Sequence, residues 1–432
     1  MPRPRKNAPK PNTQELSLVP VEEQPYPLPE GWKWVRLGSI ADILNGFMFK
    51  SEKYVTEGIR IIRISNVQDG FLEDDKPVFY PLSEHQEIEK FMLSPYDLLI
   101  SLTGNVGRTA IICNNLLPAA VNQRVLRVRI KNRTLLNYIF YFTQRKQFQN
   151  ECIANSKGSA QLNLSSSYIN SLAIPVPPLD VQERIVTHIE SLFAKLDEAK
   201  EKAEAVLDSY ETRKAAILHK AFTGELIGKK DVTPTSLESI LNTIRIGPFG
   251  SALHEEDYID DGIPVINPKH IVKQRIQAQR KVSITSQKAE ELASYRLAEN
   301  DIILGRRGEM GRCAPVTAQE AGWLCGTGSM ILRPKPGFSA KFYSLIISSQ
   351  ASVQYLETNA VGTTLKNLNE KIVRKLPIPE FTAEEQKQLT RILDSLLEKE
   401  QQSKEAAETV LEQIDLMKKA ILAKAFRGEL GN

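Results

Sequence analysis

The sequence ILHKAFTGEL at residues 217–226 returns almost unchanged as ILAKAFRGEL at residues 421–430, an offset of 204 residues in a chain of 432. Because this offset is close to half the chain, it indicates two similar domains rather than a solenoid, whose periods are much shorter. Two copies of one unit can be related by a pseudo-two-fold axis, as the subunits of a homodimer are. That geometry suits a ligand with two-fold character, and duplex DNA read at two half-sites is the leading example.

The repeat extends far beyond these two stretches. At the same offset, a Gly-x-x-Gly-Arg motif occurs at residues 104–108 and again at residues 308–312. The offset becomes 200 near Leu37, and it becomes 206 between Arg127 and Arg333. Small insertions of this kind belong in surface loops, so we expect two copies of one fold.

The composition is that of a soluble globular protein, with 41% hydrophobic and 25% charged residues. No run approaches the roughly 18 apolar residues that a membrane span needs. The four cysteines have no C-x-x-C spacing, so we expect reduced thiols rather than a zinc site or a disulfide framework. These features predict a cytoplasmic protein with no membrane partner.

The net charge is +4, but the first ten residues alone carry four basic side chains and no acidic one. The remainder is balanced, so bulk charge does not by itself indicate a nucleic-acid binder. Residues 1–30 are basic and rich in proline, with few side chains that could form a core, and we expect them to be disordered.

Beyond this tail, mixed α/β stretches alternate with long helices. Residues 59–64 and 97–102 are rich in β-branched and aliphatic side chains, which predicts two strands. Prolines at 175–178 break the pattern, and a capping box at Asp180 and Glu183 predicts the start of a helix. The expected order is tail, domain, helix, domain, helix, at residues 1–30, 31–178, 179–228, 229–380 and 381–432.

Both long helices carry a heptad stripe of apolar residues. The stripes comprise Ile185, Ile189, Leu192, Leu196 and Val206 in the first helix and Leu389, Leu393, Leu396, Val410, Ile414 and Ile421 in the second. Such a stripe is too narrow for a buried helix, so we expect the two helices to pack on each other, antiparallel if a two-fold axis relates the copies. Arg213 interrupts the first stripe, and Glu400 interrupts the second. Near Glu400 we expect pairing that is looser or that is open to a partner.

These features together resemble the specificity subunits of type I restriction–modification systems. The resemblance is carried by the connector IPVPPL at residues 174–179 and by the long helix that ends in KAFTGEL at residues 220–226. The opening LPEGW at residues 28–32 is similar to the start of their target-recognition domains, and the match covers residues 28–432. It implies an α/β (α+β) protein with two target-recognition domains, pseudo-two-fold related and separated by two long antiparallel coiled-coil helices.

The resemblance also implies a function. Each domain would read one half of a split, asymmetric sequence in double-stranded DNA, and the helices would act as a spacer and dock two methyltransferase subunits. Translocase/nuclease subunits would complete the restriction complex. S-adenosylmethionine, ATP and Mg²⁺ would belong to those partners, so this chain is expected to have no cofactor and no catalytic residue of its own.

The Gly-x-x-Gly-Arg motifs each follow an expected strand. They predict tight turns that let backbone N–H groups and an arginine, Arg108 or Arg312, approach a phosphate. A structural turn whose arginine forms a local salt bridge explains the motif equally well. Arg306 and Arg307 stand beside the second turn, and arginine suits both phosphates and guanine edges. Because the first domain has no counterpart to this pair, the two domains differ as readers of unlike half-sites would.

Other candidates are polar loops and residues that follow matched strands. A loop-to-helix cap is the alternative for the polar loops, and a solvated surface pair is the alternative for Arg306 and Arg307. The complete set of candidate DNA-binding residues is Arg63, Asn66, Asn105, Arg108, Lys157, Lys269, His270, Arg306, Arg307, Arg312 and Lys366.

Two other functions compete with DNA recognition. A self-contained methyltransferase or nuclease should carry a glycine-rich cofactor loop or an Asn/Asp-Pro-Pro-aromatic motif, and residues 267–270 (NPKH) lack the second proline and the aromatic. No phosphate-binding G-x-x-x-x-G-K-[ST] loop is present either. A coiled-coil scaffold that binds only protein stays open, and salt-dependent, sequence-selective DNA binding would distinguish it from a DNA reader.

Overall fold

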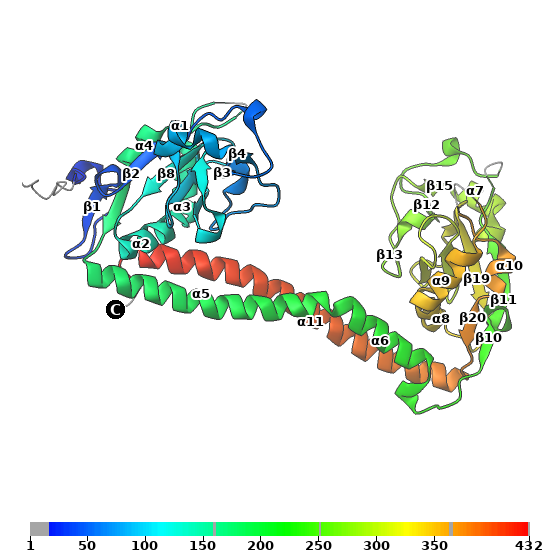
Figure 1. Cartoon of the computed structure of the whole chain (residues 1–432). Helices are drawn as coiled ribbons and strands as arrows, with labels where there is room; N and C mark the ends of the chain where they lie inside the picture. Colours follow the sequence, from blue (N-terminus) through cyan, green and yellow to red (C-terminus); the bar gives the residue numbers. More distant parts are fainter. Residues whose placement is uncertain (1–16, 159–160, 250–251, 363–365, 431–432) are drawn as a thin grey trace, which may run out of the picture. The chain divides into compact units, whose positions relative to one another are not determined.

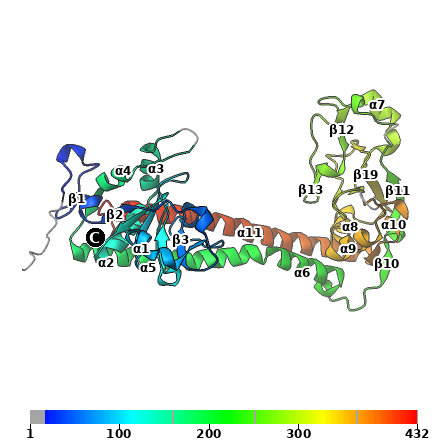
Figure 2. The same cartoon turned by 45° about the horizontal axis from the view of Figure 1, so that its top comes forward.

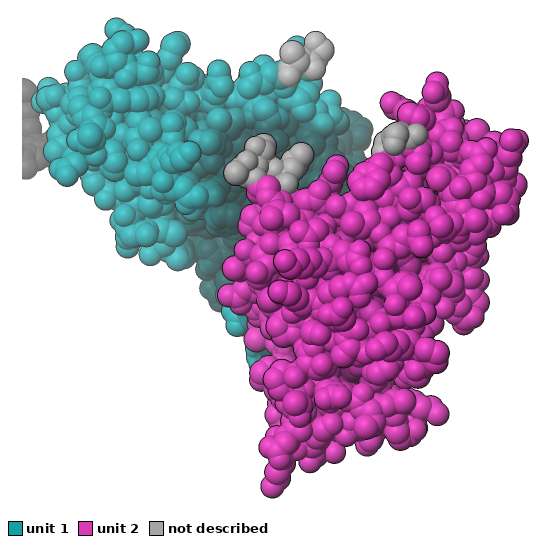
Figure 3. Space-filling model, turned by 90° about the vertical axis from the view of Figure 1, so that its right-hand side faces the viewer, with its two compact units in different colours: residues 1–202, 409–432 teal, residues 203–408 magenta. Residues whose placement is uncertain are grey.

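The chain folds into two units, which Figure 3 colours separately. Unit 1 combines residues 1–202 with residues 409–432, and unit 2 consists of residues 203–408. Each unit therefore contains one mixed α/β region and a part of both long helices. The computed structural model describes residues 17–158, 161–249, 252–362 and 366–430.

Unit 1 contains a four-stranded antiparallel sheet in the order β2-β8-β5-β6 and a three-stranded sheet in the order β4-β3-β7, while β1 pairs with β9 (Figure 1). All four residues of the central strand β5 are buried. The strands are β1 (Lys33–Arg36), β2 (Asp42–Asn45), β3 (Ile59–Ile62), β4 (Phe79–Tyr80), β5 (Leu98–Ser101), β6 (Thr109–Ile111), β7 (Ala119–Val121), β8 (Val125–Arg129) and β9 (Ala173–Val176). The short helices are α1 (His85–Ile88), α2 (Arg133–Thr143), α3 (Lys146–Ala154) and α4 (Ser166–Ser171).

Unit 2 repeats this topology, with β11-β19-β16-β17, β15-β12-β18 and the pair β10-β20 (Figure 2). The hairpin of β13 and β14 corresponds to a single antiparallel bridge between Val67 and Leu72 in unit 1. The strands are β10 (Pro234–Ser236), β11 (Leu241–Ile246), β12 (Ile263–Ile266), β13 (Ile271–Val272), β14 (Arg275–Ile276), β15 (Ser283–Ile284), β16 (Ile302–Gly305), β17 (Cys313–Pro315), β18 (Leu324–Cys325), β19 (Ser329–Pro334) and β20 (Pro377–Pro379). The short helices are α7 (Ser286–Glu291), α8 (Ala340–Ile347), α9 (Gln350–Asn359) and α10 (Glu370–Arg374).

The structure corrects one detail of the repeat. Arg129, not Arg127, is the counterpart of Arg333, because each closes two hydrogen bonds of 2.7 Å on a buried aspartate, Asp97 or Asp301. The offset of 204 therefore holds through β8 and β19, and the predicted shift to 206 is wrong. The shift to 200 near Leu37 is confirmed by the matching β1–β9 and β10–β20 pairs.

The prediction of a disordered segment up to residue 30 is wrong for its second half. Val19 is buried, and the hydroxyl of Tyr26 donates to the carbonyl of Phe426 at 2.8 Å. The indole of Trp34 donates in turn to the carbonyl of Tyr26 at 3.0 Å. Residues 17–30 are held because they cover an aromatic core that the composition of the segment alone does not show. Residues 1–16 lie outside the described part of the chain.

The long helices are α5 (Leu179–Asp208), α6 (Tyr210–Phe222) and α11 (Ala383–Ala425). The first predicted helix, 179–228, is thus divided at Ser209 and ends at Phe222. The Ser209 hydroxyl donates to the carbonyl of Ala205 at 2.6 Å and accepts from the Arg213 guanidinium. The backbone bonds from Ser209 to Ala205 and from Arg213 to Ser209 are kept. Serine side chains that bond the preceding turn often bend a helix, which fits the change at this residue.

The helices pair antiparallel within each unit, and Figures 1 and 2 show them side by side. In unit 1, Lys418 of α11 forms an ion pair with Asp197 of α5 and lies 5.0 Å from the ring of Phe193. In unit 2, Arg213 pairs with Glu400 at 2.8 Å. The two residues that interrupt the stripes therefore face each other, so the prediction of an open position at Glu400 is wrong.

The apolar stripes are largely buried as predicted. Ile185, Ile189, Leu389, Leu393 and Ile414 are buried, and Leu192, Leu196, Val206, Leu396 and Ile421 are partly buried. Val410 departs from the prediction, since it is 37% exposed.

The Arg213–Glu400 pair should contribute a modest, measurable coupling. A double-mutant cycle of Arg213→Ala and Glu400→Ala should give about 0.5–1 kcal/mol by urea denaturation, because both side chains are partly shielded from water. The exposed Glu198–Lys202 pair of α5 is the control, and its cycle should give a smaller coupling, because water screens both charges. Equal couplings for both pairs would show that shielding adds nothing.

The C-terminal end of each long helix packs in a different unit from the domain that precedes the helix in the sequence. The end of α11 packs in unit 1, and the end of α6 packs in unit 2. Phe426, at the end of α11, lies 5.0 Å from Tyr138 and 5.3 Å from Phe142 in the core of unit 1. Phe222, at the end of α6, lies 6.0 Å from Phe342 in unit 2. The repeated motif at residues 217–226 and 421–430 thus completes both cores: its first copy packs in unit 2 and its second copy packs in unit 1.

Candidate DNA interface

The register of the four-stranded sheet brings several loops to one end in each unit. In unit 1, Asn45 at the end of β2 pairs with Leu126, and Ser101 at the end of β5 pairs with Val125 at the start of β8. The segments that leave these strand ends must therefore lie together. We call this region the loop end. It consists of residues 46–48, 102–108, 122–124, 157–158 and 161–163 in unit 1 and residues 247–249, 306–312, 326–328, 361–362 and 366–367 in unit 2.

The loop end unites candidates that are far apart in the sequence. Thr103 and Lys157 both bridge to Asn163, so the Gly-x-x-Gly-Arg turn of unit 1 adjoins the small polar loop. In unit 2, Arg307 bridges to Asn367 in the same way. The exposed candidates Asn105, Lys157, Arg307 and Lys366 all belong to this region in their own units.

The second glycine of each Gly-x-x-Gly-Arg turn is required by its surroundings. Gly107 has φ +79°, and a Cβ there would lie 2.8 Å from the Cβ of Cys152. Gly311 has φ +76°, and its Cβ would lie 2.6 Å from Val353 Cγ2. Other residues rarely adopt this conformation, so glycine fixes the direction of the arginine that follows.

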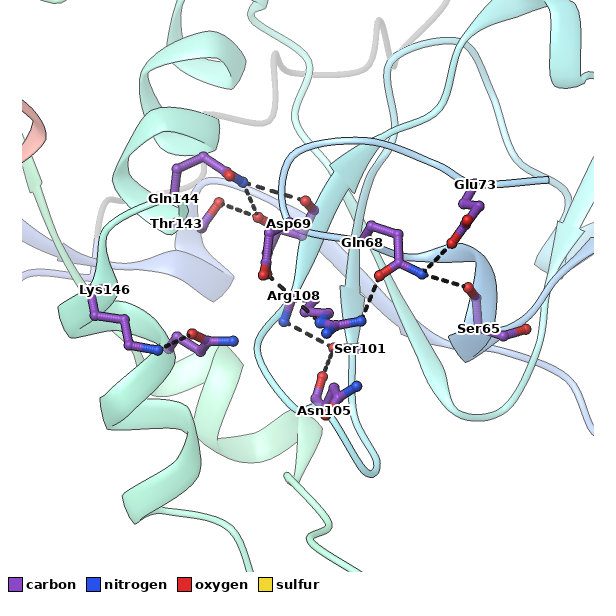
Figure 4. Close-up of polar contacts among 12 residues, drawn as sticks. Ser65, Gln68, Asp69, Glu73, Ser101, Asn105, Arg108, Thr143, Gln144 and Lys146 are labelled. Atoms are coloured by element: carbon purple, nitrogen blue, oxygen red, sulfur yellow. Dashed lines mark hydrogen bonds and ion pairs between the residues drawn. The ribbon is translucent and has the colours of Figure 1, made fainter. Parts of the chain in front are cut away.

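Both arginines of these turns are held by local partners. Arg108 donates from Nη1 to the Gln68 side chain at 2.6 Å, and its Nε lies 3.9 Å from Asp69 (Figure 4). Arg312 donates from Nε to Glu309 at 3.2 Å. Exposed ion pairs contribute only about 0–1 kcal/mol, so a phosphate could displace these partners. The local salt bridge, the predicted alternative, is present at both arginines and does not exclude DNA contact.

Asn66 and His270 must be removed from the predicted interface, because both are buried and cap short 3-10 helices. The Asn66 side chain accepts from the backbone N–H of Arg63 at 2.9 Å, and His270 Nδ1 accepts from that of Asn267 at 3.1 Å. Burial lowers the pKa of His270, and nearby Lys269 adds to this effect, which keeps the ring neutral near pH 7. Their identical roles at the 204-residue offset show that they are part of the scaffold.

Two further candidates belong to these short helices and not to the loop end: Arg63 directly precedes the first helix, and Lys269 lies within the second. Arg63 is partly buried and donates from Nη2 to the carbonyl of Lys76 at 2.9 Å. Lys269 is exposed between Pro268 and His270. The Pro268 carbonyl accepts from Arg312 Nη1 at 3.3 Å, so the segment that carries Lys269 adjoins the second Gly-x-x-Gly-Arg turn.

One arginine occurs in each unit at the same hydrogen-bonded pair, but on opposite partners. In unit 1 the N–H of Leu102 donates to the carbonyl of Arg124 at 2.9 Å, and in unit 2 the N–H of Arg306 donates to that of Gly328 at 2.9 Å. Arg124 is exposed, and its guanidinium has no hydrogen bond or ion pair with the residues that the structure describes. Sequence reasoning missed Arg124, although comparing it with Gly328 at the offset of 204 would have exposed the exchange.

Arg306 is more constrained than Arg124. Its Nε donates to the carbonyl of Leu368 at 2.9 Å. Burial lowers its pKa and the neighbouring Arg307 lowers it further, although an arginine stays charged at neutral pH. At this hydrogen-bonded pair, unit 2 has Arg306, which is held by the Leu368 carbonyl, beside the exposed Arg307. Unit 1 has the exposed Arg124 at the matching place.

The remaining chemistry of the chain is limited to what the described residues can show. Among them no group of three or more His, Cys, Asp or Glu side chains could hold a metal ion. No helix in the same part of the chain is long and apolar enough to cross a membrane. Cys113 is exposed, whereas Cys152, Cys313 and Cys325 are buried and unpaired.

Known proteins are similar to this chain both in sequence and in fold. The sequence model of the type I restriction modification DNA specificity domain matches residues 29–207 and again residues 236–413. The specificity subunit of the type I restriction enzyme EcoBI from Escherichia coli is 26% identical over 425 residues, covering 93% of this chain and 86% of that one. The EcoKI specificity subunit from Escherichia coli strain K12 is 23% identical and covers 93% of this chain and 90% of its own length.

Solved structures show the same fold at low identity. The HsdS subunit from Thermoanaerobacter tengcongensis aligns with a TM-score of 0.64 and 18% identity over 94% of this chain and all of that one. A chain from a study of complex assembly and conformational transition of the type I R-M system aligns with a TM-score of 0.68 and 19% identity, over 94% of this chain and all of that one. Because the domain model matches most of the chain, once in each copy of the repeat, this protein belongs to the family of type I restriction–modification DNA specificity subunits.

Proposed function

We propose that the loop end of each unit contacts one half of a split, asymmetric DNA target. The exchange of arginines carries this proposal. The same backbone hydrogen bond places Arg124 on one partner in unit 1 and Arg306 on the other partner in unit 2. A scaffold that keeps its backbone and moves its cation presents different donors to DNA, and arginine donors read guanine edges and phosphates.

The free cations set the electrostatics of this interface. Arg124, Arg307 and Lys157 are exposed at their loop ends. Each cation that neutralises a phosphate releases counterions, so binding should weaken steeply with salt although the net charge of the chain is only +4. Local clustering, rather than bulk charge, supplies the attraction.

The partners of the complex follow from membership of the family. We propose that two methyltransferase subunits dock on the long helices and that restriction subunits complete the complex in the cytoplasm. S-adenosylmethionine, ATP and Mg²⁺ are assigned to those partners, and this chain contributes recognition and spacing without catalysis. In unit 1 an apolar groove of about 430 Å³, lined by Leu192, Leu196, Met417 and Ile421, supports docking of a protein on the helices.

The test is DNA binding by the full chain assembled with its methyltransferase. The target is first mapped from methylated sites in cells that carry both subunits. The double variant Arg306→Ala/Arg307→Ala should then weaken DNA binding by about 1–3 kcal/mol per arginine. It should lower sequence selectivity only in the half-site of unit 2. Arg124→Ala should do the same only in the half-site of unit 1.

Arg280→Ala is the matched control in unit 2. Arg280 is 82% exposed and pairs with Asp261 outside the loop end, so its loss should leave affinity and recognition unchanged. If the Arg306/Arg307 variant binds as well as the parent, the loop end is not the interface. If the parent complex shows no salt-sensitive, sequence-selective binding, the chain is a protein scaffold instead.

A further inference from the structure

Large apolar side chains are exposed at the loop end of each unit: Met48 in unit 1, and Phe249 together with the smaller Val361 (53% exposed) in unit 2. Met48 is 70% exposed and Phe249 is 67% exposed. They occupy the same place, because β2 ends at Asn45 opposite Leu126 and β11 ends at Ile246 opposite Met330. A single exposed apolar residue needs no explanation. Its recurrence in both copies, with a different side chain in each, does.

The backbone that carries each side chain is tightly held. A Cβ on Gly46 would lie 2.1 Å from the carbonyl oxygen of Asn122, and one on Gly247 would lie 1.9 Å from that of Gly326. Only glycine allows the segment to lie this close to the turn before β8 or β19. Met48 and Phe249 each follow two residues later, so both start from a fixed backbone.

In unit 1, Met48 is also held from both sides. Phe47 is partly buried and Phe49 is buried, and their rings are 5.1 Å apart. In unit 2, Pro248 is buried just before Phe249, and the Phe249 carbonyl accepts from the N–H of Ala252 at 2.9 Å. The described backbone on which each exposed side chain stands is therefore held by its neighbours.

The cations described above belong to backbone segments that adjoin the segments carrying these apolar residues. The carbonyl of Phe47 accepts from the N–H of Gln123 at 2.9 Å, so Met48 and Arg124 each follow one partner of this hydrogen bond. In unit 2, Gly247 lies against Gly326 in the turn before β19. Two residues later in the same turn, the Gly328 carbonyl accepts from the N–H of Arg306. Each loop end thus combines at least one exposed apolar side chain with at least one arginine.

This pairing of side chains suits DNA better than it suits a protein or a membrane. The arginine binds phosphates or guanine edges, while an apolar side chain contacts the methyl group of thymine or the face of a base. We propose that Met48 and Phe249 are base-contacting residues that determine part of the recognised sequence, Met48 in the half-site of unit 1 and Phe249 in that of unit 2. This inference rests on the proposed DNA interface.

The experiment compares discrimination between half-sites. The full chain, assembled with its methyltransferase, is titrated against three synthetic duplexes: the mapped target, the target with its first half-site scrambled, and the target with its second half-site scrambled. Met48→Ala should lower affinity for the mapped target about tenfold, which is typical for loss of one base contact. It should leave affinity for the duplex without the unit 1 half-site unchanged. Phe249→Ala should show the mirror result.

Val55→Ala and Ile259→Ala are the matched controls. Val55 and Ile259 also correspond at an offset of 204 and are 40% and 39% exposed, but they lie outside the loop end. Neither change should affect discrimination. Assembly with the methyltransferase should be unchanged in all four variants. Thermal melting should be unchanged in Met48→Ala and Phe249→Ala, because both side chains are mostly exposed.

Three outcomes would overturn the inference. Met48→Ala and Phe249→Ala could retain full discrimination, they could lower affinity for all three duplexes equally, or they could abolish assembly with the methyltransferase and so indicate a protein contact. These failures are distinct from failure of the proposed function. In that case the unsubstituted complex would itself show no preference for the mapped target.

Discussion

Replacing Phe426 by alanine should remove about 3–5 kcal/mol from the stability of unit 1. The ring is fully buried and packs edge-on against Tyr138 and Phe142, while the Arg145 guanidinium lies 5.2 Å from its centre. Truncation leaves a cavity among these groups. It also loosens the N-terminal segment, because the Tyr26 hydroxyl bonds to the backbone of residue 426.

Because a chain with two units need not unfold in one step, the effect must be measured locally. Hydrogen exchange should show lost protection in α2, with α8 of unit 2 unaffected. The control is Leu416→Ala on the same helix, since Leu416 is 64% exposed and its loss should cost less than about 0.5 kcal/mol. Equal losses from both variants, or a loss confined to unit 2, would contradict the crossed arrangement of the helix ends.

The second large effect is expected at Asp301. Its buried carboxylate accepts two hydrogen bonds of 2.7 Å from Arg333 and one of 2.7 Å from the N–H of Ala298. Asp301→Ala strands these donors and should destabilise unit 2 by about 3 kcal/mol. Part of the cost is offset because the Arg333 side chain is partly exposed and can turn to water.

Denaturation of the Asp301 variant, followed by hydrogen exchange in β16 and β19, measures this effect. Asp394→Ala is the control, because the Asp394–Lys341 pair of the same unit is exposed on both sides and should contribute less than about 0.5 kcal/mol. Asp97→Ala should reproduce the result in unit 1, where Asp97 holds Arg129 and the N–H of Ser94. A loss no greater than that of Asp394→Ala would refute a structural role for the buried carboxylate.

Local sequence patterns predicted the elements of this protein well. The strands at residues 59–64 and 97–102 were predicted because β-branched and aliphatic side chains favour buried strands. The heptad helices were predicted because burial on one face imposes a period on the sequence. The same patterns failed at Arg213 and Glu400. Each residue alone reads as a defect in an apolar stripe, and only the register between the helices brings the two charges together.

The candidate interface was predicted less completely. Asn66 and His270 are polar residues that follow strands, as binding residues often do, yet their side chains close the backbone of short helices. Arg124 was missed because it sits in a turn with no motif. Its importance depends on the hydrogen bond between its carbonyl and Leu102, which joins segments that are distant in the chain.

The sequence by itself determined that there are two copies of one fold, where their long helices lie and which family they belong to, because repeats and periodicities are written in residue order. The tertiary structure decided which helix end closes which core, which polar groups are used up inside the scaffold and which cations share one surface with Met48 or Phe249. These properties depend on strand register and packing between residues far apart in the chain, and a one-residue change of register would turn each side chain to the opposite face.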